Sequence, residues 1–193
     1  DMSNSTLFLK LVGSSRILGD FIVYTSADWR GGGLGFQLQN AYMSTKYFTF
    51  GYTIGTFMDI NAIPTTIDYG GPCGMTFYRA TQLQFRYGFG FGLSMGIAVE
   101  APNVNATGGE YIDVGAQRCP NIPLFVQYNL HNNPNNHIRL GAVMRDISYT
   151  DKVKGVDTDK VGWGVQASML ATIGKLQLKG QLTVGEGIGS LVN

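Results

Sequence analysis

Apolar and polar residues alternate along most of this chain. In residues 91–99 one parity is apolar, and the residues between are glycine, serine or alanine. Residues 161–169 and 176–184 repeat the pattern, with mostly apolar side chains on one parity and glycine, glutamine, serine, threonine or lysine on the other. A period of two predicts β-strands whose two faces differ in chemistry.

The same test along the whole chain predicts an all-β protein of about ten antiparallel strands. Their expected ranges are 4–13, 18–28, 36–46, 48–56, 76–87, 91–101, 120–130, 137–148, 161–172 and 175–185. Most are about 9 to 12 residues long, which exceeds the usual strand of a soluble sheet and matches a tilted membrane strand. Short turns alternate with long connections at 57–75, 102–119 and 149–160. This alternation is typical of outer-membrane β-barrels.

The composition is compatible with membrane strands. Charged residues make up 14% of the 193 residues, against about 25% in ordinary soluble domains. No segment approaches the roughly 18 to 20 uncharged apolar residues of a transmembrane helix, whereas strands with one face in lipid need only half of their residues to be apolar. The net charge of +1 and the lack of basic runs give no reason to expect a nucleic-acid partner.

The two faces of the predicted strands differ in a way that favours a water-filled lumen. A soluble sandwich normally carries many lysines and glutamates on its polar face, but here that face is glycine, serine, glutamine and threonine with a few arginines. Aromatic residues gather near strand ends, where they suit a lipid-water boundary: Tyr47, Phe48, Tyr87, Phe89, Phe91, Tyr128, Tyr149 and Trp163. The alternative is a secreted soluble sandwich that binds carbohydrate by stacking on these rings.

Basic and amide side chains on the polar parity are the candidate binding residues. The set is Lys10, Arg79, Gln82, Gln84, Arg86, Arg139, Arg145 and Lys179. Arg79 is one step out of parity with Gln82, Gln84 and Arg86, so it lies above the lipid zone or follows a bulge. Low-dielectric walls strengthen the field of such charges, and arginine pairs with carboxylates through two hydrogen bonds. The alternative role for each arginine is a salt bridge within the wall.

The sequence contains no constellation typical of an enzyme, a cofactor site or a metal site. It has no G-x-S-x-G, H-E-x-x-H or Walker A motif. His131 and His137 flank a predicted turn, and we interpret both as solvated; a membrane-embedded hydrolase with a Ser-His pair is the remaining enzymatic alternative. Cys73 and Cys119 lie in loop-like segments, and the sequence leaves open whether they pair.

The connection at 57–75 departs from the alternating pattern. Together with Thr56 it reads TFMDINAIPTTIDYGGPCG, which is too long for a tight turn and rich in apolar side chains. Structureless loops of this length are uncommon and usually functional. We expect it to fold inward, with a short helical turn before Pro64, and to constrict the channel. The alternative is an external loop that caps the rim or plugs a neighbouring subunit.

The stretch GTFMDINAIPTTIDYGGPCGMTFYR, residues 55–79, resembles the loop-three region of DcaP-like porins, which are trimeric outer-membrane channels. The residues that match the family's motif are Phe57, Asp59, Pro64, Asp68, Gly71, Pro72, Gly74, Phe77 and Arg79. Similarity extends through LGDFIVYTSADWRGG, QNAYMSTKYFTFGYTIGTF and GWGVQASMLATIGKLQLKGQLTVGEGIG, so that it covers nearly the whole chain.

The resemblance implies a homotrimeric porin in the outer membrane of a Gram-negative bacterium. It implies passive uptake of small anionic solutes, dicarboxylates among them, through a lumen lined by arginine and narrowed by the 57–75 loop, with no cofactor and no catalysis. We expect residues 1–193 to form one β-barrel domain that is part of a larger barrel of about 16 strands. The family often has arginines at the positions of Thr6, Gln37 and Gln39. These three uncharged side chains reduce the positive charge that would favour anions. The alternative function is a structural or adhesive barrel whose loops bind a surface partner.

Overall fold

A computed structural model describes residues 5–32, 35–64, 74–104, 111–114, 117–130, 133 and 135–192. They form an antiparallel sheet of 11 strands in the order β1-β2-β3-β4-β5-β6-β8-β9-β10-β11, with β7 paired to β9. The strands are β1 (Thr6–Ser15), β2 (Gly19–Gly31), β3 (Gly35–Thr45), β4 (Phe48–Ile54), β5 (Arg79–Gly88), β6 (Leu93–Glu100), β7 (Ile112–Asp113), β8 (Ile122–Asn129), β9 (His137–Asp151), β10 (Val156–Ile173) and β11 (Leu176–Glu186). The described residues also form two short 3-10 helices, η2 (Ile60–Ala62) and η5 (Gly189–Leu191).

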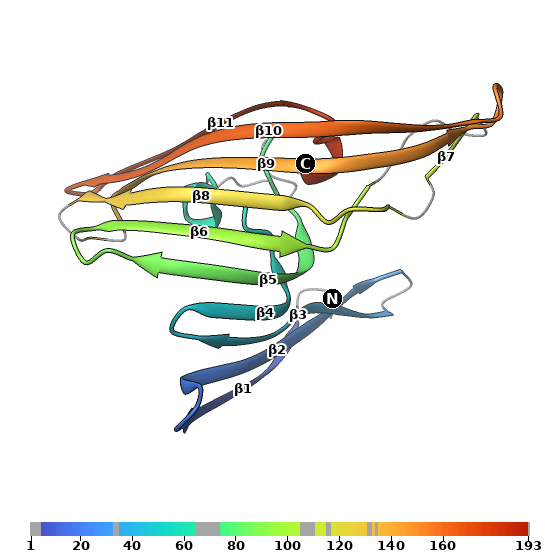
Figure 1. The fold of residues 1–193 in the computed structure, drawn as a ribbon. Coiled ribbons are helices and arrows are strands. Elements are labelled where there is room, and N and C mark those ends of the chain that lie inside the picture. The colour runs from blue at the N-terminus through green and yellow to red at the C-terminus, as the bar shows by residue number, and fades with distance from the viewer. Residues whose placement is uncertain are drawn as a thin grey trace.

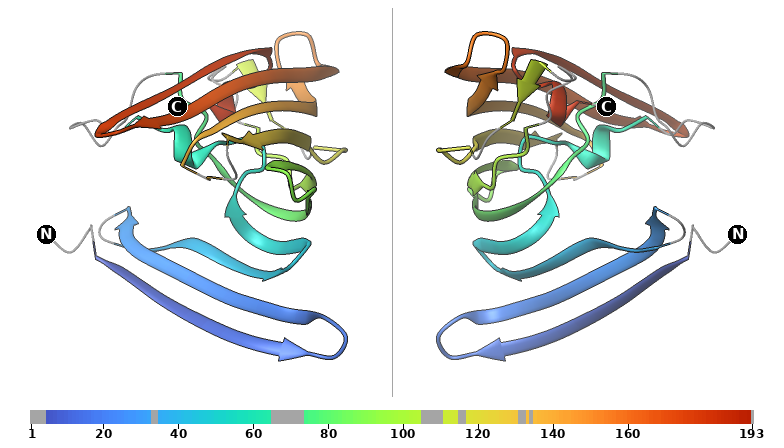
Figure 2. Two further views of the ribbon diagram at one scale, coloured as in Figure 1. Left: turned by 90° about the vertical axis from the view of Figure 1, so that its left-hand side faces the viewer. Right: turned by 90° about the vertical axis from the view of Figure 1, so that its right-hand side faces the viewer.

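The ten long strands overlap the ten predicted ranges, and each pairs with the next long strand in the sequence. In Figure 1 they lie side by side from β1 at the bottom to β11 at the top. Within the described ranges no pairing joins β1 to β11, so the sheet is open and has two free edges. Figure 2 shows that it is strongly curved, with both 3-10 helices on its concave side.

The prediction of a long loop at 149–160 is wrong. Strands β9 and β10 continue to Asp151 and from Val156, leaving a turn of four residues between them. The Asp151 carboxylate accepts the backbone N–H groups of Val153 and Lys154, and Gly155 takes the positive φ of 63° that the turn requires. The hairpin end is polar on both parities, with Thr150 donating to Asp157 at 2.7 Å. A search for apolar alternation therefore missed it.

In contrast to a soluble protein, the sheet exposes apolar side chains on its convex face and buries polar side chains on its concave face. Along β5, Ala80, Gln82 and Gln84 are buried while the residues between them are exposed. The exposed parity is apolar over most of the sheet, and Leu182, for example, is 69% exposed. Because each Å² of apolar surface left in water costs about 25 cal/mol, this convex face needs an apolar environment. No helix in the described part of the chain is long and apolar enough to cross a membrane.

Two segments that are distant in sequence cover the concave face together. They are the described residues of the connection between β4 and β5, 55–64 and 74–78, hereafter the β4–β5 connection, and residues 187–192 after β11. The two meet in an antiparallel bridge between Thr76 and Val192, and Phe77 donates its backbone N–H to Leu191 at 3.0 Å. Their apolar side chains share one core with the sheet, formed by Phe57, Met58, Tyr78, Ala80, Val143, Ile188 and Leu191.

A glycine sets how closely the β4–β5 connection approaches the sheet. A Cβ atom added at Gly55 would lie 2.1 Å from ring carbons of Tyr78. Only glycine therefore lets the chain turn inward directly after β4 while the Tyr78 ring packs against it.

Candidate functional site

A polar cavity of about 530 Å³ lies on the concave face beside the β4–β5 connection. The wall contributes side chains from β3, β4, β5, β6, β8 and β9, and the connection contributes residues from Gly55 to Asn61. Polar and aromatic side chains that line the cavity include Tyr42, Gln84, Arg86, Phe125, Gln127 and Arg139. The cavity is thus bounded by the sheet on one side and by the connection on the other.

Two of the predicted arginines converge on one aromatic ring in this cavity. The guanidinium carbons of Arg139 and Arg86 lie 3.8 and 5.7 Å from the ring centroid of Phe125. Phe125 has room on the concave face because Gly96 stands opposite it, where a Cβ atom would lie 2.3 Å from the ring. Cations over aromatic faces are attracted to the ring quadrupole, so Phe125 holds two positive charges on the wall of the cavity.

The predicted glutamines hold the start of the β4–β5 connection. The Thr56 hydroxyl donates to Gln82 Oε1 at 2.6 Å and accepts from Gln84 Nε2 at 2.7 Å. Gln82 Nε2 donates to the carbonyl of Ile54 at 2.6 Å, and Arg139 Nη2 donates to the carbonyl of Thr56 at 2.5 Å. Gln82, Gln84 and Arg139 therefore position Thr56, and Arg86, which is exposed, is the arginine open to the cavity.

A buried glutamate completes this anchorage. Glu100 accepts the backbone N–H of Thr56 at 2.6 Å and the hydroxyl of Tyr78 at 2.9 Å. Burial, and then the adjacent charge of Glu100, hold the pKa of Tyr78 well above its ordinary value. The phenol therefore remains a hydrogen-bond donor to Glu100 at any pH that the folded protein meets.

The middle of the connection is held by Asp59. Its carboxylate accepts the backbone N–H of Asn61 at 3.2 Å and so caps η2. It also contacts His137 Nε2 at 2.9 Å and accepts the Ser168 hydroxyl at 2.5 Å. Burial opposes ionisation, but the hydrogen bonds from Ser168 and His137 and the charge of Arg139 hold the pKa of Asp59 below its ordinary value. Asp59 is therefore a carboxylate at neutral pH.

The interpretation of His137 as solvated is wrong, because its side chain is fully buried beneath the connection. His131 lies outside the described residues. Ser168, His137 and Asp59 do not form a nucleophilic triad, since the Ser168 hydroxyl donates to the carboxylate and has no second proton for the imidazole. No group of three or more histidine, cysteine or acidic side chains suited to a metal occurs in the described ranges.

Arg145 lies apart from the cavity, although the sequence grouped it with Arg139. Its Nη1 donates to the carbonyl of Gly187 at 3.1 Å and to the hydroxyl of Ser190 at 2.9 Å, and its Nη2 donates to the carbonyl of Asn103. The Arg145 side chain is buried, and it fastens residues 187–192 and the start of the segment after β6 to the wall.

The remaining basic candidates, Lys10, Arg79 and Lys179, lie far apart on the sheet and outside the cavity. Lys10 on β1 and Lys179 on β11 share the concave face but lie on the two edge strands. Arg79 lies on the convex parity at the start of β5, without a bulge in its pairing to β4, and its guanidinium is 5.6 Å from the ring of Phe77. Neither lysine nor Arg79 lines the cavity.

The motif residues of the 57–75 loop are only partly described. Phe57 and Asp59 are buried, Pro64 is half-buried, and Gly74 is exposed with a φ of 90°. Asp68, Gly71 and Pro72 lie outside the described residues, as does Cys73, so its pairing with Cys119, which is exposed, stays untested.

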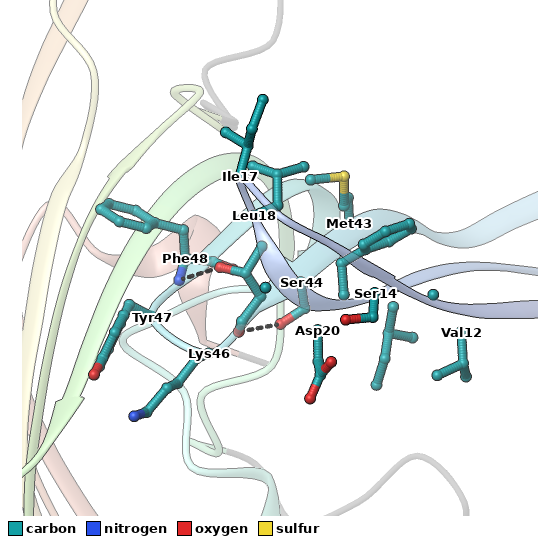
Figure 3. A pocket seen from close by; sticks show the side chains of 15 residues that line it. Val12, Ser14, Ile17, Leu18, Asp20, Met43, Ser44, Lys46, Tyr47 and Phe48 are labelled. Carbon is teal, nitrogen blue, oxygen red and sulfur yellow. Dashed lines mark hydrogen bonds between the residues drawn. The ribbon is translucent and has the colours of Figure 1, made fainter.

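A second hollow, of about 1300 Å³, lies between the β1–β2 and β3–β4 turns. Figure 3 shows the side chains that line it, with Ile17, Leu18, Met43 and Phe48 among them. It is mainly apolar and shares only Ser44 with the polar cavity. The aromatic residues expected near strand ends contribute to its rim through Tyr47 and Phe48.

Sequence reasoning missed Thr56, Phe125, His137 and Ser168 as parts of the site. One signal was available for Phe125, an aromatic residue on the same parity as Gln127 and Asn129 in a strand whose other parity is apolar. Nothing in the sequence pairs Ser168 or His137 with Asp59, because the three become neighbours only when the connection folds back on the sheet.

No protein-family model and no curated protein matches this chain. Among solved structures, it is similar to the crystal structure of the outer membrane channel DcaP of Acinetobacter baumannii, with a TM-score of 0.84. This chain has the fold of DcaP. The match covers 98% of this chain and 54% of the DcaP chain at 16% sequence identity, so the chain spans about half the length of DcaP. The resemblance to DcaP-like porins is thereby confirmed at the level of the fold, and DcaP is a channel.

Proposed function

We propose that this chain forms the wall of an outer-membrane porin of a Gram-negative bacterium, through which small anionic solutes diffuse passively. The observation that carries the proposal is the reversed sheet, apolar outside and polar inside, with Arg86 and Arg139 facing a cavity beside an inward-packed connection. The likeness to the DcaP channel supports it. The function is transport without catalysis and without a cofactor.

We infer that the sheet belongs to a larger closed barrel. Unpaired backbone groups cost several kcal/mol each in hydrocarbon, so the free edges of β1 and β11 need strand partners if the convex face contacts lipid. The chain covers only 54% of DcaP, which leaves room for further strands in a barrel of about 16. The proposed assembly is a homotrimer, as the family resemblance implies.

The proposed constriction lies where the β4–β5 connection, within 57–75, faces the arginines. Gln127 and Arg86 offer side-chain N–H groups to a solute there, and arginine binds a carboxylate through two parallel hydrogen bonds. Two positive charges on one ring suit a dicarboxylate. Binding stays weak enough for release because the cavity is open to water.

Ion selectivity in planar bilayers tests this proposal. In a salt gradient, we expect Arg86→Gln to lower the anion-to-cation permeability ratio about fivefold, since unit charges at contact distance interact by roughly 1 kcal/mol in water. Lys10→Gln is the matched control, because it removes one positive charge from the same face at the edge strand. Equal selectivity in the wild-type and Arg86→Gln channels would contradict the proposed role of the arginines.

A structural or adhesive barrel is the second candidate, favoured by the β9–β10 hairpin. Its strands extend beyond their neighbours, as Figure 1 shows at the right, and β7 pairs with the extension. Correct membrane insertion without any conductance would favour this candidate over the porin.

A further inference from the structure

One carboxylate links the β4–β5 connection to two strands of the wall. Asp59 contacts His137 at the start of β9 and Ser168 within β10, while it caps η2 in the connection itself. The side chains of all three are almost completely buried, and Asp59 is 2% exposed. A charge buried to this degree is stable only when it is hydrogen-bonded on several sides.

This anchor lies at the edge of the polar cavity. Asp59 lines the cavity together with Ile60 and Asn61, and Arg86 lines it from the wall. Ile60 is 50% exposed and Asn61 is also exposed, whereas Met58 and Ala62 on either side are buried. Residues 59–61 are therefore held in place by these buried neighbours and by the contacts of the Asp59 carboxylate.

The other contacts of the connection hold different residues. Thr56 is fixed by Gln82, Gln84 and Glu100, and Phe57 is buried in the apolar core. Losing the Asp59 contacts would leave this first part docked and loosen residues 59–61, which would then be held by the burial of Met58 and Ala62 alone. The connection thus has a fixed base and a separately fastened tip.

We propose that Asp59, His137 and Ser168 form a latch that holds the tip of the connection against the wall and keeps the passage open. When the latch breaks, residues 59–61 leave the wall, enter the passage and interrupt the current. His137 and Ser168 are positioning residues in this account, since they act on the solute path through Asp59. The inference rests on the proposed function, which supplies the passage that the tip would block.

Single-channel recording of latch variants in the full-length protein tests the proposal. We expect Asp59→Asn, His137→Ala and Ser168→Ala to raise the frequency of brief closures about tenfold, as for the loss of one buried hydrogen bond to a charged group. His137→Gln, which keeps a side-chain N–H donor, should restore part of the wild-type behaviour. Ser148→Ala is the control, because it also removes a buried serine hydroxyl that donates to a carboxylate, that of Asp159 at 2.7 Å, but does not contact the β4–β5 connection or line the cavity.

Amide hydrogen exchange at Asn61 gives a second readout that does not need a working channel. The latch predicts faster exchange at Asn61 in Asp59→Asn and Ser168→Ala, with exchange at Thr56 unchanged because Glu100 still accepts that amide. If Asp59→Asn does not fold, Ser168→Ala decides, since it removes one hydroxyl group. Wild-type closure frequency and wild-type Asn61 exchange in Ser168→Ala overturn the latch.

The two readouts separate failure of the latch from failure of the porin function. A wild-type protein that inserts but conducts no current refutes the passage, and with it the role of the latch in keeping it open. Faster Asn61 exchange in the variants would then identify a purely structural anchor. A conducting wild type with unaltered variants refutes the latch alone.

Discussion

The concave faces of β1–β3 and of β5–β10 differ although their strands alternate in the same way. Side chains on β5, β9 and β10 alternate between buried and exposed, whereas nearly all of β1 is exposed. In Figure 2 the 3-10 helices lie against the part of the sheet near β9 to β11, away from the β1–β2 hairpin. The candidate site is therefore formed where the β4–β5 connection and residues 187–192 cover the sheet, because strands without such a cover leave their polar face open.

The chemistry of the two concave faces follows the same division. The face of β1–β3 carries a row of rings, in which Phe8 contacts Tyr24 at 6.2 Å and Tyr24 contacts Tyr42 at 5.5 Å between centroids. The face of β5 and β9 carries Gln82, Gln84 and Arg139, which bind Thr56 of the connection. Polar wall residues therefore dock a segment of the chain as well as line the cavity.

The largest expected difference between the two faces is in the stability lost when a packed side chain is removed. Phe57→Ala should lower the free energy of unfolding by about 3 to 5 kcal/mol, because the ring is fully buried between the connection and the wall. Phe8→Ala, on a ring that is 64% exposed on the uncovered face, should cost less than about 1 kcal/mol. Chemical unfolding in detergent measures both. A Phe8→Ala cost equal to that of Phe57→Ala would mean that the face of β1–β3 is covered in the whole protein.

Removing one tyrosine hydroxyl from each face should give a smaller difference in stability. Tyr78→Phe should destabilise the protein by about 1.5 to 3 kcal/mol, because it takes a hydrogen bond from the buried carboxylate of Glu100. Tyr24→Phe removes the same group from the face of β1–β3, outside the polar cavity, and should stay within about 0.5 kcal/mol. The same unfolding assay compares them, and similar costs for both would refute the special role of Glu100.

Acid should weaken the docking of the connection by a smaller amount. The folded pKa of Asp59 lies below the ordinary value of 3.8, so its ionised form stabilises the fold above that pH. This contribution is fully present at neutral pH and is lost as the pH falls from about 4 through the lower folded pKa. Exchange at Asn61 measured between pH 7 and pH 3 should reveal it once corrected for the intrinsic pH dependence of exchange. Asp59→Asn should remove the dependence, and an unchanged dependence in that variant would assign it to another group.

The strands and their two faces could be predicted from the sequence because a strand's side-chain alternation is local. Leucines and valines on one parity of β6 and β11 mark the convex face without any knowledge of the fold. The unusual composition of the β4–β5 connection also marked it as a segment with its own role. The extension of β9 and β10 was missed because polar pairs such as Ser148 and Asp159 stabilise it.

The candidate site was less predictable because its contacts join distant parts of the chain. Arg86 and Arg139 were found from parity, but parity places Arg145 on the same face and gives no sign that it binds the segment after β11. His137 had the sequence context of a solvated turn residue. Its burial depends on Asp59, which comes from another strand connection.

The sequence by itself determined an antiparallel sheet with an apolar and a polar face, and it marked the connection that crosses the polar one. These properties follow from side-chain alternation and from local turn chemistry, both of which depend only on residues that are close together in the sequence. The tertiary structure was needed to show which polar residues dock the connection and which line the open part of the cavity. That division depends on close packing and on hydrogen bonds between Asp59, His137 and Ser168, which are far apart in the chain and meet only after the sheet has curved around them.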